Sequence, residues 1–454
     1  MRTLHDQKVA DSYNTAVACY WRGDLHATLS RIDKQLDALS IILRARTLRR
    51  LRQDEQALDL LQKAVRANWP PGLVAEASIV QAMALTRLNR LAEAKGLHER
   101  ARRLAVTSPS VDLQLELLNC ESLIHFAAQD LESTRKVALA TLAAASNGAE
   151  PRKCFVPVET SKAFALDLLA CAAAASGSNW KQAIYSEAAI DVLEKGKVFD
   201  ACMHAYILET LSCLLREVDA YENVRFIADH AARIGEQDSL KGLRARIQHA
   251  LEFKRLLTAP DQAAADRLAE IGKSSAEIPT RMIAILDGER FKRSGGHWSG
   301  VTLDRACKLS ESVSWKDTGD YRSALLVLAR ELAPVSTARA RRVMDTYGSI
   351  PTALSPTLLA NFNSRRRSQE AFVWGLVYRA EGQKEQAVAK LKEAFEAYDA
   401  VGYRWRATLA AVELAELTGS QYFGNFAMKE ADARPNSWLA RRVHLSRIRV
   451  ARGG

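Results

Sequence analysis

The 454-residue sequence contains few of the residues that break helices or form tight turns. It has 22 glycines and 11 prolines, whereas 48% of its residues are hydrophobic and 26% are charged. A β-sandwich or β-barrel needs frequent turns, and glycine and proline are among the residues that build them. The scarcity of both therefore favours helices over a turn-rich β architecture.

Cysteine patterns and long apolar runs are also missing. The seven cysteines are odd in number, widely spread, and include no Cys-x-x-Cys pair. They therefore look like reduced core residues rather than a disulfide framework or a zinc site. Because no apolar leader opens the sequence and no uncharged apolar run reaches the length of a membrane helix, we expect a soluble cytoplasmic protein without a membrane partner.

The sequence also lacks the motifs of catalytic and metal-binding sites. Gly272-Lys273-Ser274 has the end of a phosphate-binding loop, but Arg267 stands where that loop needs its first glycine. The nine histidines lie apart, without the spacings that place two imidazoles on one helix face. The sequence therefore predicts no enzymatic activity, no cofactor and no metal site.

The clearest pattern that is present runs from Ala371 to Ala394. Ala371 and Gly375 fall on one helix face by their spacing, Gly382 ends that helix, and Ala387 and Ala394 fall on one face of the next. Small residues at Gly375 and Ala387 allow two backbones to come close. The stretch therefore predicts two short helices packed back to back.

Weaker copies of this pattern recur along the chain. The small residues of their second helices are Thr28, Ala57, Ala94, Thr134, Ala183 and Val224. The unit resembles the tetratricopeptide repeat (TPR), a helical hairpin of about 34 residues that stacks into solenoids. The resemblance implies an all-α, right-handed α-solenoid of TPR-like helical hairpins with irregular repeat length.

Breaks in the apolar pattern divide the chain into four parts. We expect a TPR-like solenoid over residues 1–255, an irregular helical or hinge segment over 256–300, a second TPR-like solenoid over 301–435 and a basic tail over 436–454. The hinge is placed where Glu289–Gly300 has paired glycines and no apolar period. The tail from Arg441 onward is predicted to be dispensable for folding, because it has no apolar repeat for a further hairpin.

Candidate partner-binding residues follow from the TPR resemblance. The first-helix positions that line the concave surface of such proteins carry an aromatic shelf beside an arginine cluster here, and the candidates are Tyr13, Tyr20, Trp21, Arg46, Arg49, Arg50 and Arg87. Guanidinium groups suit carboxylates and phosphates, and aromatic rings offer contact area at little entropic cost. We expect the arginines to be exposed, so that their removal weakens binding without changing stability. The alternative is a solvated helix face whose aliphatic stems cover apolar neighbours.

The C-terminal tail offers a second basic surface. Its candidate anion-binding or nucleic-acid-binding residues are Arg441, Arg442, Arg447, Arg449 and Arg452, and no acidic residue follows Asp432. The alternative is a basic terminal helix that caps the solenoid.

Two nearby stretches have a further family resemblance. WRATLAAVELAELTG, from Trp405, and PNSWLARR, from Pro435, resemble the end of the helical repeat arm in LuxR-type transcriptional regulators of the maltose-activator class. In those regulators a helix-turn-helix DNA-binding domain usually follows, and we expect none before Gly454. The resemblance implies a regulator-like sensory or interaction arm.

These observations predict a non-enzymatic regulator or adaptor that holds a peptide, protein segment or effector in a concave TPR groove. The net charge of +11 is compatible with an acidic protein partner and with nucleic acid. Direct nucleic-acid binding through the groove and tail arginines is therefore the alternative. Whether the chain forms homo-oligomers is left open.

Overall fold

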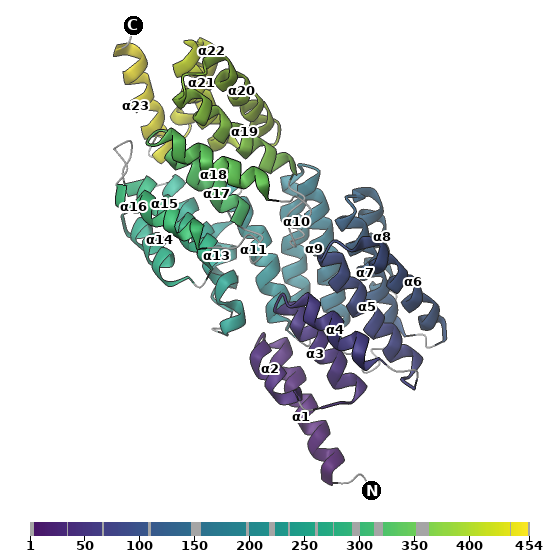
Figure 1. The fold of residues 1–454 in the computed structure, drawn as a ribbon. Helices are drawn as coiled ribbons and strands as arrows, with labels where there is room; N and C mark the ends of the chain where they lie inside the picture. The colour runs from purple at the N-terminus through teal and green to yellow at the C-terminus, as the bar shows by residue number, and fades with distance from the viewer. Residues whose placement is uncertain are drawn as a thin grey trace. The chain divides into compact units, whose positions relative to one another are not determined.

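The computed structural model describes residues 4–33, 35–65, 68–107, 110–146, 156–196, 199–217, 223–234, 237–258, 262–275, 277–292, 300–312, 321–350, 363–435 and 437–452. Helices joined by turns make up these ranges, and no strand occurs within them (Figure 1). The predicted all-α array of helical hairpins is confirmed. Within the same ranges, no helix combines the length and the apolar composition needed to cross a bilayer.

The chain divides into two compact units, which are described separately below. Unit 1 consists of Met1–Leu211, Ala232–Lys241 and Pro356–Asn361, and unit 2 of Ser212–Ala231, Gly242–Ser355 and Phe362–Gly454. These divisions do not coincide with the boundaries expected around residues 256–300. The hinge and domain boundaries derived from the sequence stay predictions.

Unit 1 is a series of antiparallel helical hairpins. Its helices are α1 (Leu4–Trp21), α2 (Leu25–Ile32), α3 (Ala38–Arg50), α4 (Asp54–Ala64), α5 (Pro71–Arg87), α6 (Leu91–Thr107), α7 (Val111–Ala127), α8 (Leu131–Ser146), α9 (Val158–Ala175), α10 (Asn179–Lys195), the first part of α11 (Ala201–Glu217) and the 3-10 helix η1 (Asp238–Leu240). Figure 1 shows α5 to α10 lying side by side. The odd-numbered helices up to α9 are the first helices of their hairpins.

Small residues lie where the second helix of each hairpin meets its neighbours. Thr28, Ala57, Ala94, Thr134 and Ala183 are all buried, as their spacing predicted. The threonine hydroxyls at these contacts donate to backbone carbonyls one turn earlier, so their burial leaves no donor unsatisfied. The irregular spacing of these residues reflects second helices of unequal length, from the short α2 to the long α6.

One residue of each hairpin turn in unit 1 adopts a left-handed backbone conformation. These residues are Gly23, Arg52, Asn89, Gln129 and Gly177, with φ between 60° and 80°. Glycine reaches this region freely, whereas residues with a Cβ atom pay roughly 1–2 kcal/mol there. Arginine and glutamine give no such turn signal, which is why the sequence analysis did not single out Arg52.

Unit 2 continues the hairpins. Its elements are the last part of α11, α12 (Val224–Ala231), α13 (Lys241–Thr258), α14 (Gln262–Ser274), α15 (Ile278–Lys292), α16 (Gly300–Glu311), α17 (Tyr321–Leu332), α18 (Thr337–Ser349), α19 (Asn363–Ala380), α20 (Lys384–Ala400), α21 (Arg404–Thr418), α22 (Gln421–Asp432) and α23 (Trp438–Arg452). Leu268 on α14 and Leu286 on α15 are fully buried. Most of the segment expected to be irregular therefore consists of regular packed helices. The glycine-rich residues 293–299 lie outside the described residues.

The close helix approach predicted in the clearest hairpin is present between α19 and α20. A Cβ atom placed on Gly375 would lie 2.6 Å from Cγ of Leu391, a distance too short for two carbon atoms. Ala387 and Ala394 on α20 are fully buried, and Ala371 on α19 is almost so. The hairpin read from the sequence is therefore confirmed at the level of its contacts.

The C-terminal segment forms a helix that packs on its neighbours, which favours the alternative of a basic terminal helix. That the part from Arg441 onward is dispensable for folding stays a prediction. Trp438 and Val443 of α23 are buried, and the Trp438 ring meets Phe291 edge to face at 5.4 Å. Arg442 pairs with Glu413 at 3.3 Å, so this arginine stabilises the helix on its neighbour. The apolar residues were overlooked because they serve one face of a single helix instead of a further hairpin.

We predict that Trp438→Ala lowers the free energy of unfolding of unit 2 by about 3–5 kcal/mol, because it removes a large buried ring from the contact between α15, α21 and α23. Urea denaturation followed by circular dichroism measures the effect. Arg441→Ala, an exposed change on the same helix, is the matched control and is expected to stay within about 0.5 kcal/mol. Equal effects of the two changes would show that α23 does not contribute to folding through this ring.

Candidate functional site

The partner-binding residues predicted in unit 1 come from α1, α3 and α5, whose first-helix positions lie next to one another. Helix α3 contacts both α1 and α5, and α5 contacts α7. The structure therefore brings the predicted aromatic residues and arginines into one region. We call Arg46, Arg49, Arg50, Arg52 and Arg87 the arginine cluster. Its members differ in how their charges are balanced.

Arg46 is neutralised inside the protein. Its Nη2 atom donates to Glu76 Oε1 at 2.9 Å and to Glu116 Oε2 at 2.5 Å. Burial lowers the pKa of Arg46, but the charges of Glu116 and Glu76 outweigh that effect and leave the pKa above its ordinary value. Arg46 is only 6% exposed, so the expectation that this arginine faces solvent is wrong. Glu76 on α5 and Glu116 on α7 hold the Arg46 guanidinium inside the protein.

Arg50 is likewise engaged by neighbours. Its Nη2 atom lies 2.5 Å from Asp200 Oδ2, and its guanidinium carbon lies 3.9 Å from the centre of the Tyr20 ring. Tyr20 and Trp21 are themselves buried, so the predicted aromatic shelf lies beneath Arg50 instead of facing a partner. Tyr13 is only half-buried, and burial together with the Glu76 charge raises its pKa to about 12. It therefore stays a neutral hydrogen-bonding group at physiological pH.

Arg49 and Arg87 share a single carboxylate, that of Asp54. Arg87 Nε lies 3.4 Å from Asp54 Oδ2, and Arg49 Nε lies 3.9 Å from Oδ1. Arg87 also donates to the backbone carbonyl of Arg49 at 2.7 Å. Burial and the nearby charge of Arg52 lower the pKa of Arg87 to about 10, and burial lowers the pKa of Arg49. Arg49, Arg52 and Arg87 form one end of the arginine cluster, and at this end positive charge exceeds negative charge.

The sequence analysis missed the groups that decide this balance. Asp54, Glu76 and Glu116 were not among the candidate binding residues, and Asp200 lies 150 residues from the arginine that it pairs with. No local pattern signals a contact at that separation. Arg52 and Tyr206, whose ring the Arg52 guanidinium faces at 5.2 Å, were missed for the same reason.

The structure does not gather the C-terminal arginines in the same way. Arg441 is exposed, whereas Arg442 is held by Glu413. The side chains of Arg447, Arg449 and Arg452 lie outside the described residues. Anion or nucleic-acid binding by this segment stays a prediction.

Unit 2 has its own buried charge network, also formed by first helices. Asp287 on α15 lies 3.1 Å from His249 Nε2 on α13 and 3.6 Å from both Arg290 on α15 and Arg330 on α17. Arg330 also pairs with Glu331 at 2.6 Å. Each of these side chains is at most 12% exposed. The network therefore links three helices inside the unit.

Asp167 is a buried acid on α9. Its Oδ1 atom accepts no hydrogen bond from the described residues. Burial raises the pKa of Asp167 to about 7, and the charge of Glu209, on the unit 1 part of α11, adds to the increase. Near neutral pH this carboxyl group is therefore partly protonated in the folded protein.

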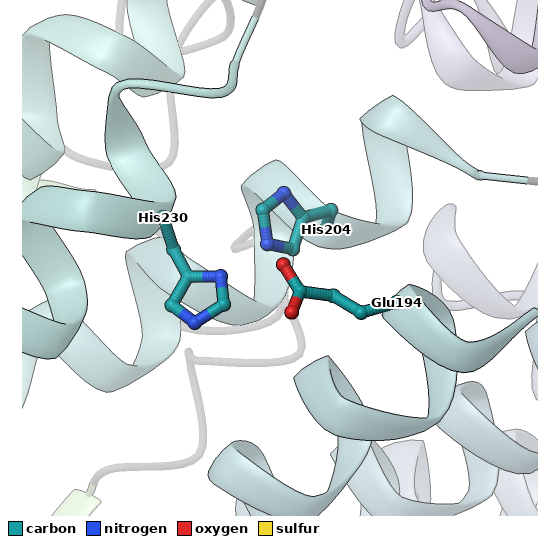
Figure 2. Close-up of side chains that lie close together, drawn as sticks. All are labelled: Glu194, His204 and His230. Carbon is teal, nitrogen blue, oxygen red and sulfur yellow. The ribbon is translucent and has the colours of Figure 1, made fainter.

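Figure 2 draws three side chains of types that can bind metal ions, Glu194, His204 and His230. Glu194 and His204 belong to unit 1, where Glu194 pairs with Arg233 and His204 lies edge to face with Phe199. His230 belongs to unit 2. We assign no joint role to residues of different units.

Comparison with known proteins gives only remote similarities. The chain is similar to a chain of the APC/C hetero-tetramer Cut9–Hcn1, with 11% identity, 100% coverage of this chain, 95% of that chain and a TM-score of 0.32. It is also similar to the TPR domain of P58(IPK), with 13% identity, 91% and 99% coverage and a TM-score of 0.24. No protein-family model and no curated protein matches the sequence. The fold assignment therefore rests on the helices themselves, and the LuxR-type resemblance stays a prediction.

We predict that Arg46→Ala lowers the free energy of unfolding by about 3–5 kcal/mol, because it leaves Glu76 and Glu116 close together without their cation. This outcome reverses the expectation of unchanged stability drawn from the sequence. Arg44→Ala is the matched control on the same helix, since Arg44 pairs with the exposed Asp33, and it should cost at most about 1 kcal/mol. A small effect of both changes in urea denaturation would contradict the structural role of Arg46.

Asp167→Asn is predicted to make the protein more stable at pH 8 and about equally stable at pH 4. The folded-state pKa of Asp167, about 7, exceeds its ordinary value of 3.8, so the folded protein binds more protons between these values and its stability falls as the pH rises. The gain at pH 8 can reach roughly 4 kcal/mol. Denaturation at both pH values tests this, with exposed Asp59→Asn as the control. A pH-independent difference would contradict the assignment.

Proposed function

We propose that the chain is a non-enzymatic regulator or adaptor that binds an acidic protein segment on unit 1, at the end of the arginine cluster formed by Arg49, Arg52 and Arg87. The observation that carries the proposal is the charge imbalance there: the guanidinium groups of Arg49 and Arg87 both face the carboxylate of Asp54, and Arg52 adds a third positive charge near Arg87. Uncompensated charge in a partly buried place costs free energy unless a partner supplies the opposite charge.

Arg46 and Arg50, the other two members of the arginine cluster, are less suited to bind a ligand. Arg46 and Arg50 already have carboxylate partners at 2.5 Å, so a ligand gains little by competing for them. Arg52 is exposed, which gives a ligand access to the less compensated end. An array of stacked hairpins also presents a long surface that suits an extended segment. Tyr13 is half-buried on α1 and can contribute a further contact to such a segment.

Nucleic-acid binding is the competing outcome, because phosphates would also satisfy these arginines. The predicted cytoplasmic location is retained as part of the proposal, and homo-oligomer formation is left open. Neither is needed for the charge argument.

We expect Arg87→Gln to reduce partner binding about tenfold or more, since one charge-assisted hydrogen bond contributes about 1.5–3 kcal/mol. The full chain would be immobilised and exposed to cell extract with and without nuclease treatment, and the captured proteins would be quantified by mass spectrometry. Arg135→Ala is the matched control, because Arg135 is an exposed arginine on α8 that bonds only to Ser176 among the contacts described here.

Proteins captured by the wild-type chain and by Arg135→Ala but lost with Arg87→Gln support the proposal, provided that thermal melting shows both variants folded. Capture that disappears after nuclease treatment, or that collapses with moderate salt, points to nucleic acid instead. Capture that is unaffected by Arg87→Gln would place the partner surface elsewhere.

A further inference from the structure

Arg52 occupies a turn position that arginine fills at a cost. Its φ is 65°, in the left-handed region, where the corresponding turns of the first and fifth hairpins use Gly23 and Gly177. Glycine would relieve the contact between Cβ and the backbone that this conformation creates. Residues held in such conformations cluster at functional sites, and an observed outlier is a reason to look for one.

Electrostatic repulsion by a neighbouring arginine adds a second free-energy cost at Arg52. Its guanidinium lies 5.2 Å from the Tyr206 ring, and its positive charge is near enough to Arg87 to disfavour the charged form of that side chain. Like charges repel, so a third positive charge near the two arginines that share Asp54 is unfavourable in the unliganded protein. An exposed arginine without a function could adopt a rotamer that points into solvent, away from the neighbouring positive charges.

Some guanidinium nitrogens of Arg49 and Arg87 make no hydrogen bond within the described residues. Arg87 Nε, Arg87 Nη2 and Arg49 Nε are buried and donate no hydrogen bond to the described residues, although Arg87 Nε and Arg49 Nε lie 3.4 and 3.9 Å from the oxygens of Asp54. The side chains of Arg49 and Arg87 are 16% and 13% exposed, and Arg52 is exposed, so the group reaches the surface at Arg52. Buried donors of this kind are rare in proteins and call for an acceptor.

We propose that Arg49, Arg52 and Arg87, with the Tyr206 hydroxyl, form a binding site for a phosphate group on the acidic segment. This inference rests on the proposed function and narrows its partner to a phosphorylated protein segment. Three arginines and Asp54 leave an excess of two positive charges, and a phosphate ester carries about −1.5 to −2 at neutral pH. One carboxylate would leave half of that excess unbalanced.

The geometry of the donors also favours phosphate. The three arginines come from α3, from the α3–α4 turn and from the end of α5, and the guanidinium groups of Arg49 and Arg87 meet at Asp54. A phosphate offers three strongly accepting oxygens, which can serve three guanidinium groups at once. The ring of Tyr206 on α11 lies 5.2 Å from the Arg52 guanidinium, and its hydroxyl is a further group that can donate to a phosphate.

The decisive variant is Arg52→Gly, because the proposal predicts opposite effects on stability and binding. Relief of the turn conformation should leave the melting temperature equal or higher, whereas loss of one guanidinium should weaken phosphate affinity roughly tenfold or more. Affinity for inorganic phosphate would be measured by calorimetry on the full chain, in buffers matched to chloride in ionic strength. Gln129→Gly changes the same turn position in another hairpin and should leave affinity unchanged.

A peptide containing phosphoserine separates the two sources of phosphate. Tighter binding of this peptide than of inorganic phosphate, with loss in Arg52→Gly, supports a phosphorylated segment as the ligand. Binding of inorganic phosphate alone, absence of phosphate binding by the wild-type chain, or equal binding by Arg52→Gly overturns the proposal. Since these measurements need no partner protein, phosphate binding can fail while Arg87-dependent capture of an unmodified acidic protein still stands.

Discussion

The interaction on which unit 1 depends is the bond that Arg46 makes to two carboxylates of later hairpins. Arg46 on α3 reaches Glu76 on α5 and Glu116 on α7, which is 70 residues further along the chain. In an ordinary repeat array each hairpin contacts only its neighbours, so stability is a sum of local terms. A cation that spans three first helices adds a term that no single interface contains. It therefore couples the folding of hairpins that are otherwise independent.

The same principle explains which arginines remain available for a ligand. Arg46 and Arg50 have acids placed against them by hairpins far along the chain, and their charges are used in folding. Among the described residues, the acidic partner of both Arg49 and Arg87 is Asp54, at 3.9 and 3.4 Å, and Arg52 adds positive charge near Arg87. Unit 2 uses Asp287 in a comparable way to join α13, α15 and α17. Buried charge in both units is thus chiefly structural, and the exceptions are the candidates for function.

A structural feature could be predicted from the sequence when the residues that determine it lie close together along the chain. Gly375 and the small residues of the second helices set contacts within a hairpin, and local spacing was enough to find them. The aromatic residues and arginines were also predicted to lie together, and they do. Their burial was not predictable, because it depends on Glu116 and Asp200, whose approach requires the stacking of several hairpins. Trp438 was missed for a similar reason, since its neighbour Phe291 lies in another hairpin.

Backbone conformation alone does not identify the functional end of the arginine cluster. Arg52 and Gln129 share a φ of 65° at equivalent turns, and both pay the same local cost. Gln129 is uncharged and exposed, so its conformation has no electrostatic consequence. Arg52 instead adds a positive charge near Arg87, and burial together with this charge lowers the pKa of Arg87 to about 10. The argument for a ligand therefore depends on the coincidence of strain, like charge and buried donors without acceptors, and each of these alone is compatible with a purely structural turn.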